Sequence, residues 1–252
     1  RDPNNANGLM MMSDDYMSSI FCRTIGTDED GNPIYRSEIR NIDFRNTYPA
    51  PGVSQYVLNL QKGFDKLQTL YVNNSCITGL IFPENISIKD FNIANSNIVT
   101  LKLSNQNFIT ELDVTNCKAL QILNINNCLN LRSVNIDATN QSLNTLSILD
   151  CPALTSVTIL DNSSIEKVYI SSPSVESLTI KNCNKLKSVE IAIRPLESIQ
   201  ITNCENFTTL NFIVSENDEE TKINESEKLN VFDVNNTAIQ YAGYAIDVNA
   251  AS

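Results

Sequence analysis

The stretch that decides the fold is residues 109–136, which read ITELDVTNCKALQILNINNCLNLRSVNI. Apolar residues recur in it as L-x-x-L-x-I, where x is mostly polar and any aliphatic residue can fill the apolar places. The pattern starts at Ile109, Leu120 and Leu131, so one unit takes 11 residues. A fixed period of this kind is typical of a repeat protein and has to be recognised before single elements are assigned.

The pattern continues in both directions in steps of only 10, 11 or 12 residues. The other units start at Leu67, Ile77, Ile88 and Ile98, and at Leu143, Leu154, Ile165, Val175, Leu186, Leu196 and Phe207. Two kinds of unit alternate, because the residue eight places after the start is small and polar in every second unit and more variable in the others. The full period is therefore 21 to 23 residues, made of two similar halves.

Each half predicts one short strand. Leu112 and Val114 alternate with Asp113, which favours a strand with one buried side. Only about five or six residues remain between strands, enough for a turn and too few for a stable helix. We therefore predict a right-handed, mostly β solenoid with two short parallel strands in each coil and a cap at each end.

The residue eight places after each start predicts a second, polar ladder. We interpret it as the group that satisfies backbone atoms buried at the turns. Its members are Ser75, Ser96, Cys117, Thr139, Asn162, Cys183 and Cys204 in one kind of unit, and Asn85, Gln106, Cys128, Cys151, Pro173, Arg194 and Ser215 in the other. We expect its five cysteines to be buried free thiols that pack the core, not metal ligands or disulfides.

Composition excludes several classes of protein. The chain has 252 residues, is 42% hydrophobic and carries a formal charge of −11, so it can form a core but disfavours nucleic acid and anionic membranes as partners. It has no His, which removes His-based catalysis and most zinc sites. No apolar run reaches the roughly 20 residues that span a bilayer. We expect no cofactor, no metal and no enzymatic activity.

The pattern L-x-x-L-x-I-x-x-(C/N), which covers roughly residues 39–240, resembles the leucine-rich repeat. The nested halves of 10–11 residues resemble its short bacterial subtype. Residues 28–34 (DEDGNPI) with Glu38, Ile42 and Phe44, followed by residues 63–67 (GFDKL), resemble the N-terminal region of secreted Bacteroides-type surface proteins of this family. The resemblance implies an extracellular or cell-surface, non-enzymatic protein. Because the chain starts at Arg1, we expect a signal or lipoprotein segment to have preceded it, and membrane contact only through such an anchor.

The repeat boundaries suggest four regions. We assign residues 1–60 to a disordered start and an N-terminal cap with a possible degenerate first repeat, and residues 61–214 to the solenoid. Residues 215–228 (SENDEETKINESEK) form an acidic insertion, and residues 229–252 form the last repeat and the C-terminal cap. The acids of residues 28–38 suggest a calcium loop, but they miss two EF-hand ligand positions, so a hairpin turn is the favoured interpretation.

A partner would dock on the outward positions of the first strand type. The N-terminal half of this face is acidic and the C-terminal half is rich in hydroxyl groups. The candidate ligand-binding residues are Tyr71, Asp90, Glu111, Asp113 and Asp137. An ordinary solvated sheet face is the competing interpretation.

Three functions remain open. The leading one is a surface-displayed binding module that recognises a protein from the host or the envelope, with a glycan as the less favoured ligand because aromatic residues are sparse. The second is a structural spacer without a ligand. The third is a parallel β-helix that acts on polysaccharide, in which Asp113 and Asp137 would face each other across adjacent coils as acid and base.

Overall fold

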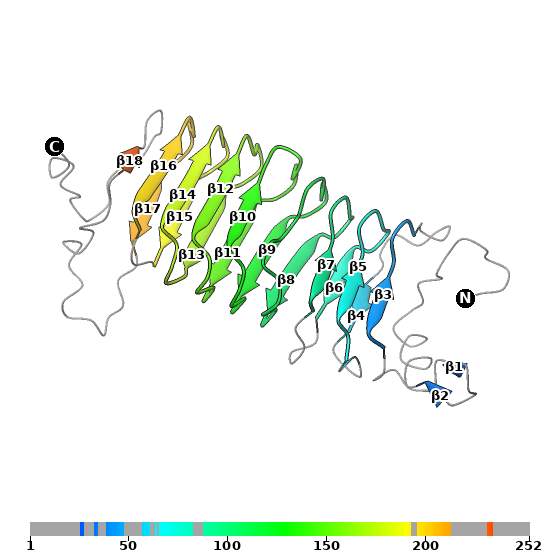
Figure 1. The fold of residues 1–252 in the computed structure, drawn as a ribbon. Helices are drawn as coiled ribbons and strands as arrows, with labels where there is room; N and C mark the ends of the chain where they lie inside the picture. The colour runs from blue at the N-terminus through cyan, green and yellow to red at the C-terminus, as the bar shows by residue number, and fades with distance from the viewer. Residues whose placement is uncertain are drawn as a thin grey trace.

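The computed structural model describes residues 26–27, 33–34, 39–47, 57–60, 64, 66–82, 88–192, 196–212 and 231–233. Within these residues the chain forms short strands joined by turns, without a helix. The coils stack along one axis from β3 (Asn41–Asp43) to β18 (Val231–Asp233), as Figure 1 shows. The predicted β solenoid with two parallel strands in each coil is confirmed.

Two walls of parallel strands enclose the core. Wall 1 consists of β3, β5 (Thr69–Tyr71), β7 (Asp90–Asn92), β10 (Ser133–Ile136), β12 (Ser156–Leu160), β14 (Ser177–Lys181), β16 (Ser198–Thr202) and β18. Wall 2 consists of β4 (Val57–Asn59), β6 (Gly79–Ile81), β8 (Thr100–Ser104), β9 (Ile122–Asn126), β11 (Thr145–Leu149), β13 (Lys167–Ser171), β15 (Ser188–Ile191) and β17 (Thr209–Phe212). Within each sheet, neighbouring strands come from successive coils; wall 2 is one sheet of eight strands, whereas wall 1 is divided into two sheets between β7 and β10.

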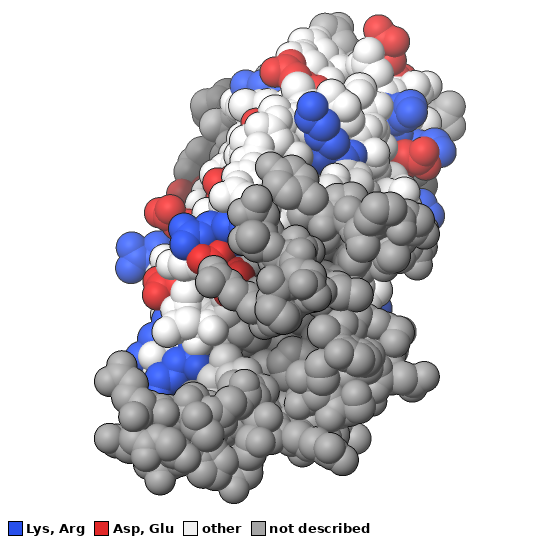
Figure 2. Space-filling model, turned by 90° about the vertical axis from the view of Figure 1, so that its right-hand side faces the viewer, with Lys and Arg blue, Asp and Glu red and all other residues white. Residues whose placement is uncertain are grey.

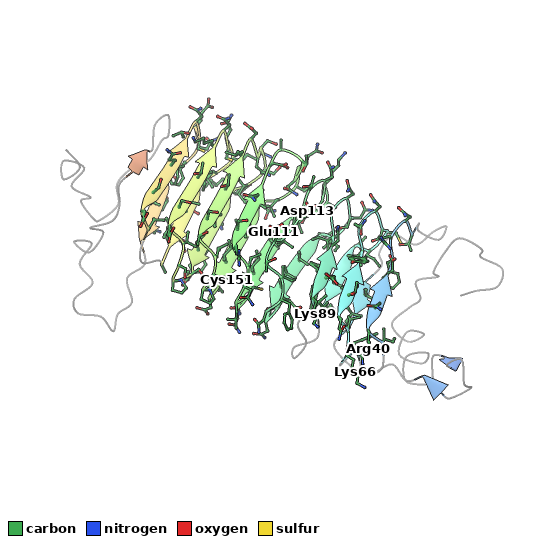
Figure 3. All side chains as sticks on the ribbon, in the orientation of Figure 1. Arg40, Lys66, Lys89, Glu111, Asp113 and Cys151 are labelled. Carbon is green, nitrogen blue, oxygen red and sulfur yellow. The ribbon has the colours of Figure 1, made fainter. Side chains whose placement is uncertain are left out.

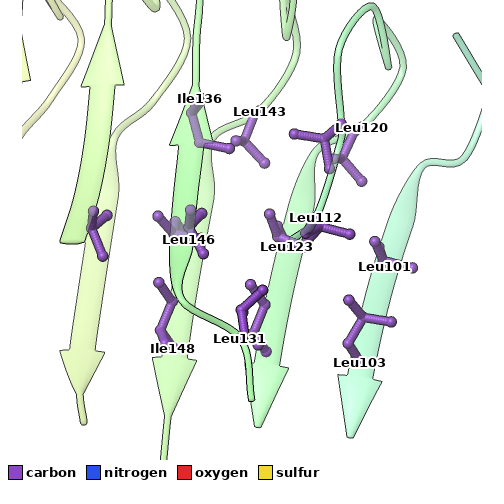
Figure 4. Close-up of a cluster of buried hydrophobic side chains, with 14 of the residues drawn as sticks. Leu101, Leu103, Leu112, Leu120, Leu123, Leu131, Ile136, Leu143, Leu146 and Ile148 are labelled. Atoms are coloured by element: carbon purple, nitrogen blue, oxygen red, sulfur yellow. The ribbon is translucent and has the colours of Figure 1, made fainter. Parts of the chain in front are cut away.

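The core forms because the repeat puts like residues on top of each other. Leu123, Leu146 and Val168 are register partners in three successive strands of wall 2, and all three are buried. Leu101, Leu120 and Leu131 belong to the same buried cluster, which is shown in Figure 4. Parallel in-register pairing therefore turns the sequence period directly into continuous aliphatic rows.

Asn recurs at the turns because of the backbone conformation that they require. The residue seven places after the start of a unit has a positive φ in ten units, with values between 49° and 59°. These residues are Asn46, Asn74, Asn95, Asn105, Asn116, Asn127, Asp150, Asp161, Asn182 and Asn203. Asn and Asp tolerate this left-handed conformation better than other residues with a Cβ atom, so the chain can reverse sharply without glycine.

The polar ladder departs from the predicted positions in two units. Asn140, not Thr139, is buried and donates a hydrogen bond from Nδ2 to the Val114 carbonyl at 2.7 Å. Ser172, not Pro173, is buried and donates to the Cys151 carbonyl at 2.6 Å. These are also the two described units that lack a positive φ at the seventh place, so a different turn moves another residue inward. Asn85, Arg194 and Ser215 lie outside the described residues.

Near the N-terminus, β1 (Gly26–Thr27) and β2 (Pro33–Ile34) pair antiparallel, Gly26 with Ile34. Residues 28–38 were considered as a calcium loop and interpreted as a hairpin turn, and only 33 and 34 of them are described. Residues 1–25 and the acidic insertion at 215–228 also lie outside the described part. Where the chain is described, no helix has the length and apolar character needed to cross a bilayer.

Candidate binding face

The five candidate residues all lie on wall 1 or directly beside one of its strands. Tyr71 is on β5 and Asp90 is on β7, whereas Asp137 directly follows β10. Glu111 lies in the coil between β7 and β10 and forms an isolated parallel bridge with Ser133, the first residue of β10. Residues 112–114 belong to the clearest sequence motif, yet they form no regular strand in the structure. Figure 3 shows Glu111 and Asp113 in the middle coils.

Asp90 and Glu111 are exposed carboxylates at the same place in the repeat, 21 residues apart. In the part of the chain that the structure describes, neither side chain accepts a hydrogen bond or pairs with a cation. The salt bridges there are Arg45–Asp43 and Lys187–Glu166. The sheet therefore holds two negative charges outward without an internal partner.

Asp113 and Asp137 have a local role as well. Oδ1 of Asp113 accepts the Thr115 N–H at 2.9 Å, and Oδ1 of Asp137 accepts the Thr139 N–H at 2.8 Å. Such bonds between a side chain and the backbone two residues on stabilise tight turns. The bridge between Glu111 and Ser133, continued by two residues, places Asn135 opposite Asp113. Asp113 and Asp137, considered above as acid and base, are therefore not opposite each other: Asp137 lies two residues beyond the position that faces Asp113.

Tyr71 is partly covered from within the chain. The guanidinium carbon of Arg45 lies 4.9 Å from the centroid of the Tyr71 ring. Nε of Arg45 also donates to Oδ1 of Asp43 at 2.9 Å, and this bond lowers the pKa of Asp43 from its usual value. One face of the ring is therefore covered by the Arg45 guanidinium, which is itself paired with Asp43, and no pattern in the sequence predicts this contact.

The C-terminal half of wall 1 is polar and uncharged in its two central rows. One row holds Ser133, Ser156, Ser177 and Ser198, and the other holds Asn135, Thr158, Thr179 and Gln200. In the described structure these side chains form no hydrogen bonds. The predicted division of the face into an acidic half and a hydroxyl-rich half is thus present in the arrangement of the strands.

The ladder cysteines are free and buried, as predicted, and four of them form pairs. Register places Cys128 beside Cys151 and Cys183 beside Cys204. Hydrogen bonding to Cys204 and burial raise the pKa of Cys183, while donation from Cys183 lowers the pKa of Cys204. Both pairs line the core side of the turns and add nothing to the outer face.

Among the residues that the structure describes, no three Cys, Asp or Glu side chains come together as a metal site. No protein-family model matches the chain, and no curated protein sequence is significantly similar to it. The arrangement on wall 1 is therefore the main guide to function.

Proposed function

We propose that the chain is a non-enzymatic binding module of the leucine-rich-repeat type, displayed on a bacterial surface, whose acidic half of wall 1 recognises a protein through basic side chains. The observation that carries this proposal is the pair Asp90 and Glu111, which are exposed to solvent and pair with no cation among the described residues. Pairing with neighbouring coils holds the backbone at both carboxylates, so a partner with complementary charges would not have to order the chain there on binding.

The leucine-rich-repeat assignment rests on the periodic core and on the small or polar ladder residues. A wall of in-register strands also offers an extended surface, which repeat proteins commonly use for binding. Secretion and surface display rest on the resemblance of the N-terminal segment alone.

We propose no catalytic role because the two carboxylates considered for it already accept backbone hydrogen bonds. Asp113 and Asp137 each hold a backbone N–H in a turn and are not register partners. A glycosidase would need two carboxyl groups on opposite sides of one bond, one of them free to hold a proton.

The experiment is affinity capture with the intact chain, from host-cell and envelope fractions. The double variant Asp90→Asn, Glu111→Gln should bind the captured protein at least about tenfold more weakly, and added salt should weaken the wild type similarly. Its matched control is Glu190→Gln, Glu205→Gln, which removes two charges elsewhere. Undiminished capture by the first variant would refute the acidic site.

A further inference from the structure

One long edge of the solenoid carries a second charged surface. We call it the basic edge: the turns that lead from wall 2 into wall 1, between Arg40 and Arg132. The charged residues described there are all basic: Arg40, Lys66, Lys89 and Arg132. The sequence of the same turns also contains Lys62, Asp65 and Glu84, which lie outside the described residues and add one positive and two negative charges. Figure 3 shows Arg40, Lys66 and Lys89 close together along the lower edge of the N-terminal coils. In the view from the N-terminal end, the lowest visible charged side chains are blue (Figure 2).

The repeat aligns these cations. The Arg40 carbonyl accepts the Gln68 N–H at 2.7 Å, the Gln68 carbonyl accepts the Lys89 N–H at 2.8 Å, and the Thr110 carbonyl accepts the Arg132 N–H at 3.0 Å. Each of these residues immediately precedes a strand position of wall 1. With a strand spacing of about 4.8 Å, the row from Arg40 to Arg132 is about 19 Å long.

Apolar side chains protrude from the same edge. Phe108 is 54% exposed and Leu129 is 42% exposed, although both are large and hydrophobic. Their turns are neighbours, because the Leu129 N–H donates to Oδ1 of Asn107 at 3.4 Å. Nζ of Lys89 lies 5.7 Å from the centroid of the Phe108 ring. The cations and the exposed apolar side chains therefore lie on the same basic edge.

We propose that the basic edge docks onto the surface of a bilayer that contains anionic phospholipid. Lys and Arg would approach the headgroups while Phe108 and Leu129 enter the interface, the combination that interfacial binding uses. The two apolar residues protrude from the tips of turns. Protruding side chains can insert into a deformable bilayer interface, whereas a peptide site would need a pocket. This proposal concerns a different surface from the acidic half of wall 1 and does not depend on it.

The net charge of −11 does not prevent such docking, because charge is segregated along the solenoid. Glu176 and Glu197 occupy the same row farther on, and Glu176 is two coils beyond Arg132, about 10 Å away. Salt screens charges over about 8 Å under physiological conditions. Asp90 and Glu111 lie closer but on the adjoining face, so they weaken the attraction without meeting the bilayer.

The test is co-sedimentation of the intact chain with vesicles of equal parts phosphatidylglycerol and phosphatidylcholine, and with vesicles of phosphatidylcholine alone. We expect binding only to the anionic vesicles, with loss at high salt. The double variant Arg40→Gln, Arg132→Gln should bind roughly 25-fold more weakly, about fivefold for each cation. Phe108→Ser should weaken binding about tenfold.

The matched controls are Lys167→Gln, Lys181→Gln, which removes two cations from the walls, and Leu160→Ser, whose side chain is 37% exposed on wall 1. Both should bind like the wild type, and circular dichroism should show all variants folded. Equal binding to both kinds of vesicle, no binding, or equal losses in the control variants would each overturn the proposal. Binding to an acidic polyglutamate peptide without vesicle binding would do so too and would identify the edge as a peptide site.

Discussion

The side-chain amide of Asn203 donates to Oδ1 of Asn182 one coil earlier, at 2.9 Å. The amide of Asn182 donates in turn to Oδ1 of Asp161 at 2.7 Å. These residues have positive φ values, so one residue type serves both the turn and the stacking of the coils.

Replacement of Asn182 separates these two roles. Asn182→Ala should destabilise the protein by about 2 kcal/mol, because Ala is strained in the left-handed region and also loses both side-chain bonds. Asn182→Gly also removes both side-chain bonds, but Gly adopts a positive φ without strain, so the loss of stability should be smaller. Urea unfolding of the two variants measures the difference. Equal midpoints would show that backbone strain is unimportant at this turn.

Asn162 is the most heavily bonded ladder residue. Nδ2 donates to the carbonyls of Asp137 and Asn140, both at 3.0 Å, and Oδ1 accepts the N–H groups of Ser164 and Ile165 at 3.0 and 2.9 Å. Asn162→Leu should therefore reduce the free energy of unfolding by about 3 kcal/mol or more, since it strands several buried backbone groups. The control is Gln121→Leu on the exposed surface, which should change stability by less than about 0.5 kcal/mol.

Truncation of the aliphatic rows tests the core. Leu146 is fully buried between its register partners Leu123 and Val168. Leu146→Ala should cost about 2–5 kcal/mol, because a stacked row can collapse only partly around the cavity. Leu160→Ala removes a partly exposed side chain and should cost much less. Chemical denaturation distinguishes the two, and similar losses would contradict the assignment of inward and outward positions.

The paired thiols should be unreactive in the native protein. Cys183 is fully buried, and its raised pKa keeps the thiolate population small at neutral pH. We expect a thiol-specific reagent to label the described cysteines only after denaturant is added. Mass spectrometry of labelled peptides identifies the sites. Rapid labelling of Cys183 or Cys204 without denaturant would show that the turns open readily.

A small pH dependence is expected from Asp43. Its pKa is lowered by Arg45, so the pair stabilises the fold above the unfolded-state pKa near 3.8 and loses this effect as the pH falls through the folded-state pKa. Asp43→Asn should lower Tm on the order of 1 °C at about pH 7, because the pair is exposed, and should match the wild type at about pH 2. A difference that grows in acid would contradict this sign.

The repeat starts were enough to predict the inward residues, because burial follows directly from a strict period. The shifted ladder in two units was not predicted, and unit length alone does not explain it, since the 10-residue unit from Ile88 keeps the usual turn. The seventh place contains the missed signal. Among the described units, this residue is Ala138 or Ser172 in the two shifted ones and Asn or Asp in the ten others, and Asn and Asp adopt a positive φ more readily than Ala or Ser.

The candidate surfaces were only partly predictable. The acidic and hydroxyl-rich halves follow from counting outward positions along the repeat. The cation over Tyr71 comes from Arg45, one coil away, and its position depends on the packing of neighbouring turns. The basic edge was missed for a related reason: Arg40, Lys89 and Arg132 become one row only when the register of successive coils is known.

Register pairing between successive coils also has a consequence for length. Because each strand bonds only to the coils before and after it, a whole coil can be added or removed while the new junction keeps the same contacts. Gain or loss of 21 to 23 residues would lengthen or shorten the rod by about 4.8 Å and leave its cross-section unchanged. The distance between two surface sites on the solenoid could thus change during evolution only in steps of one coil.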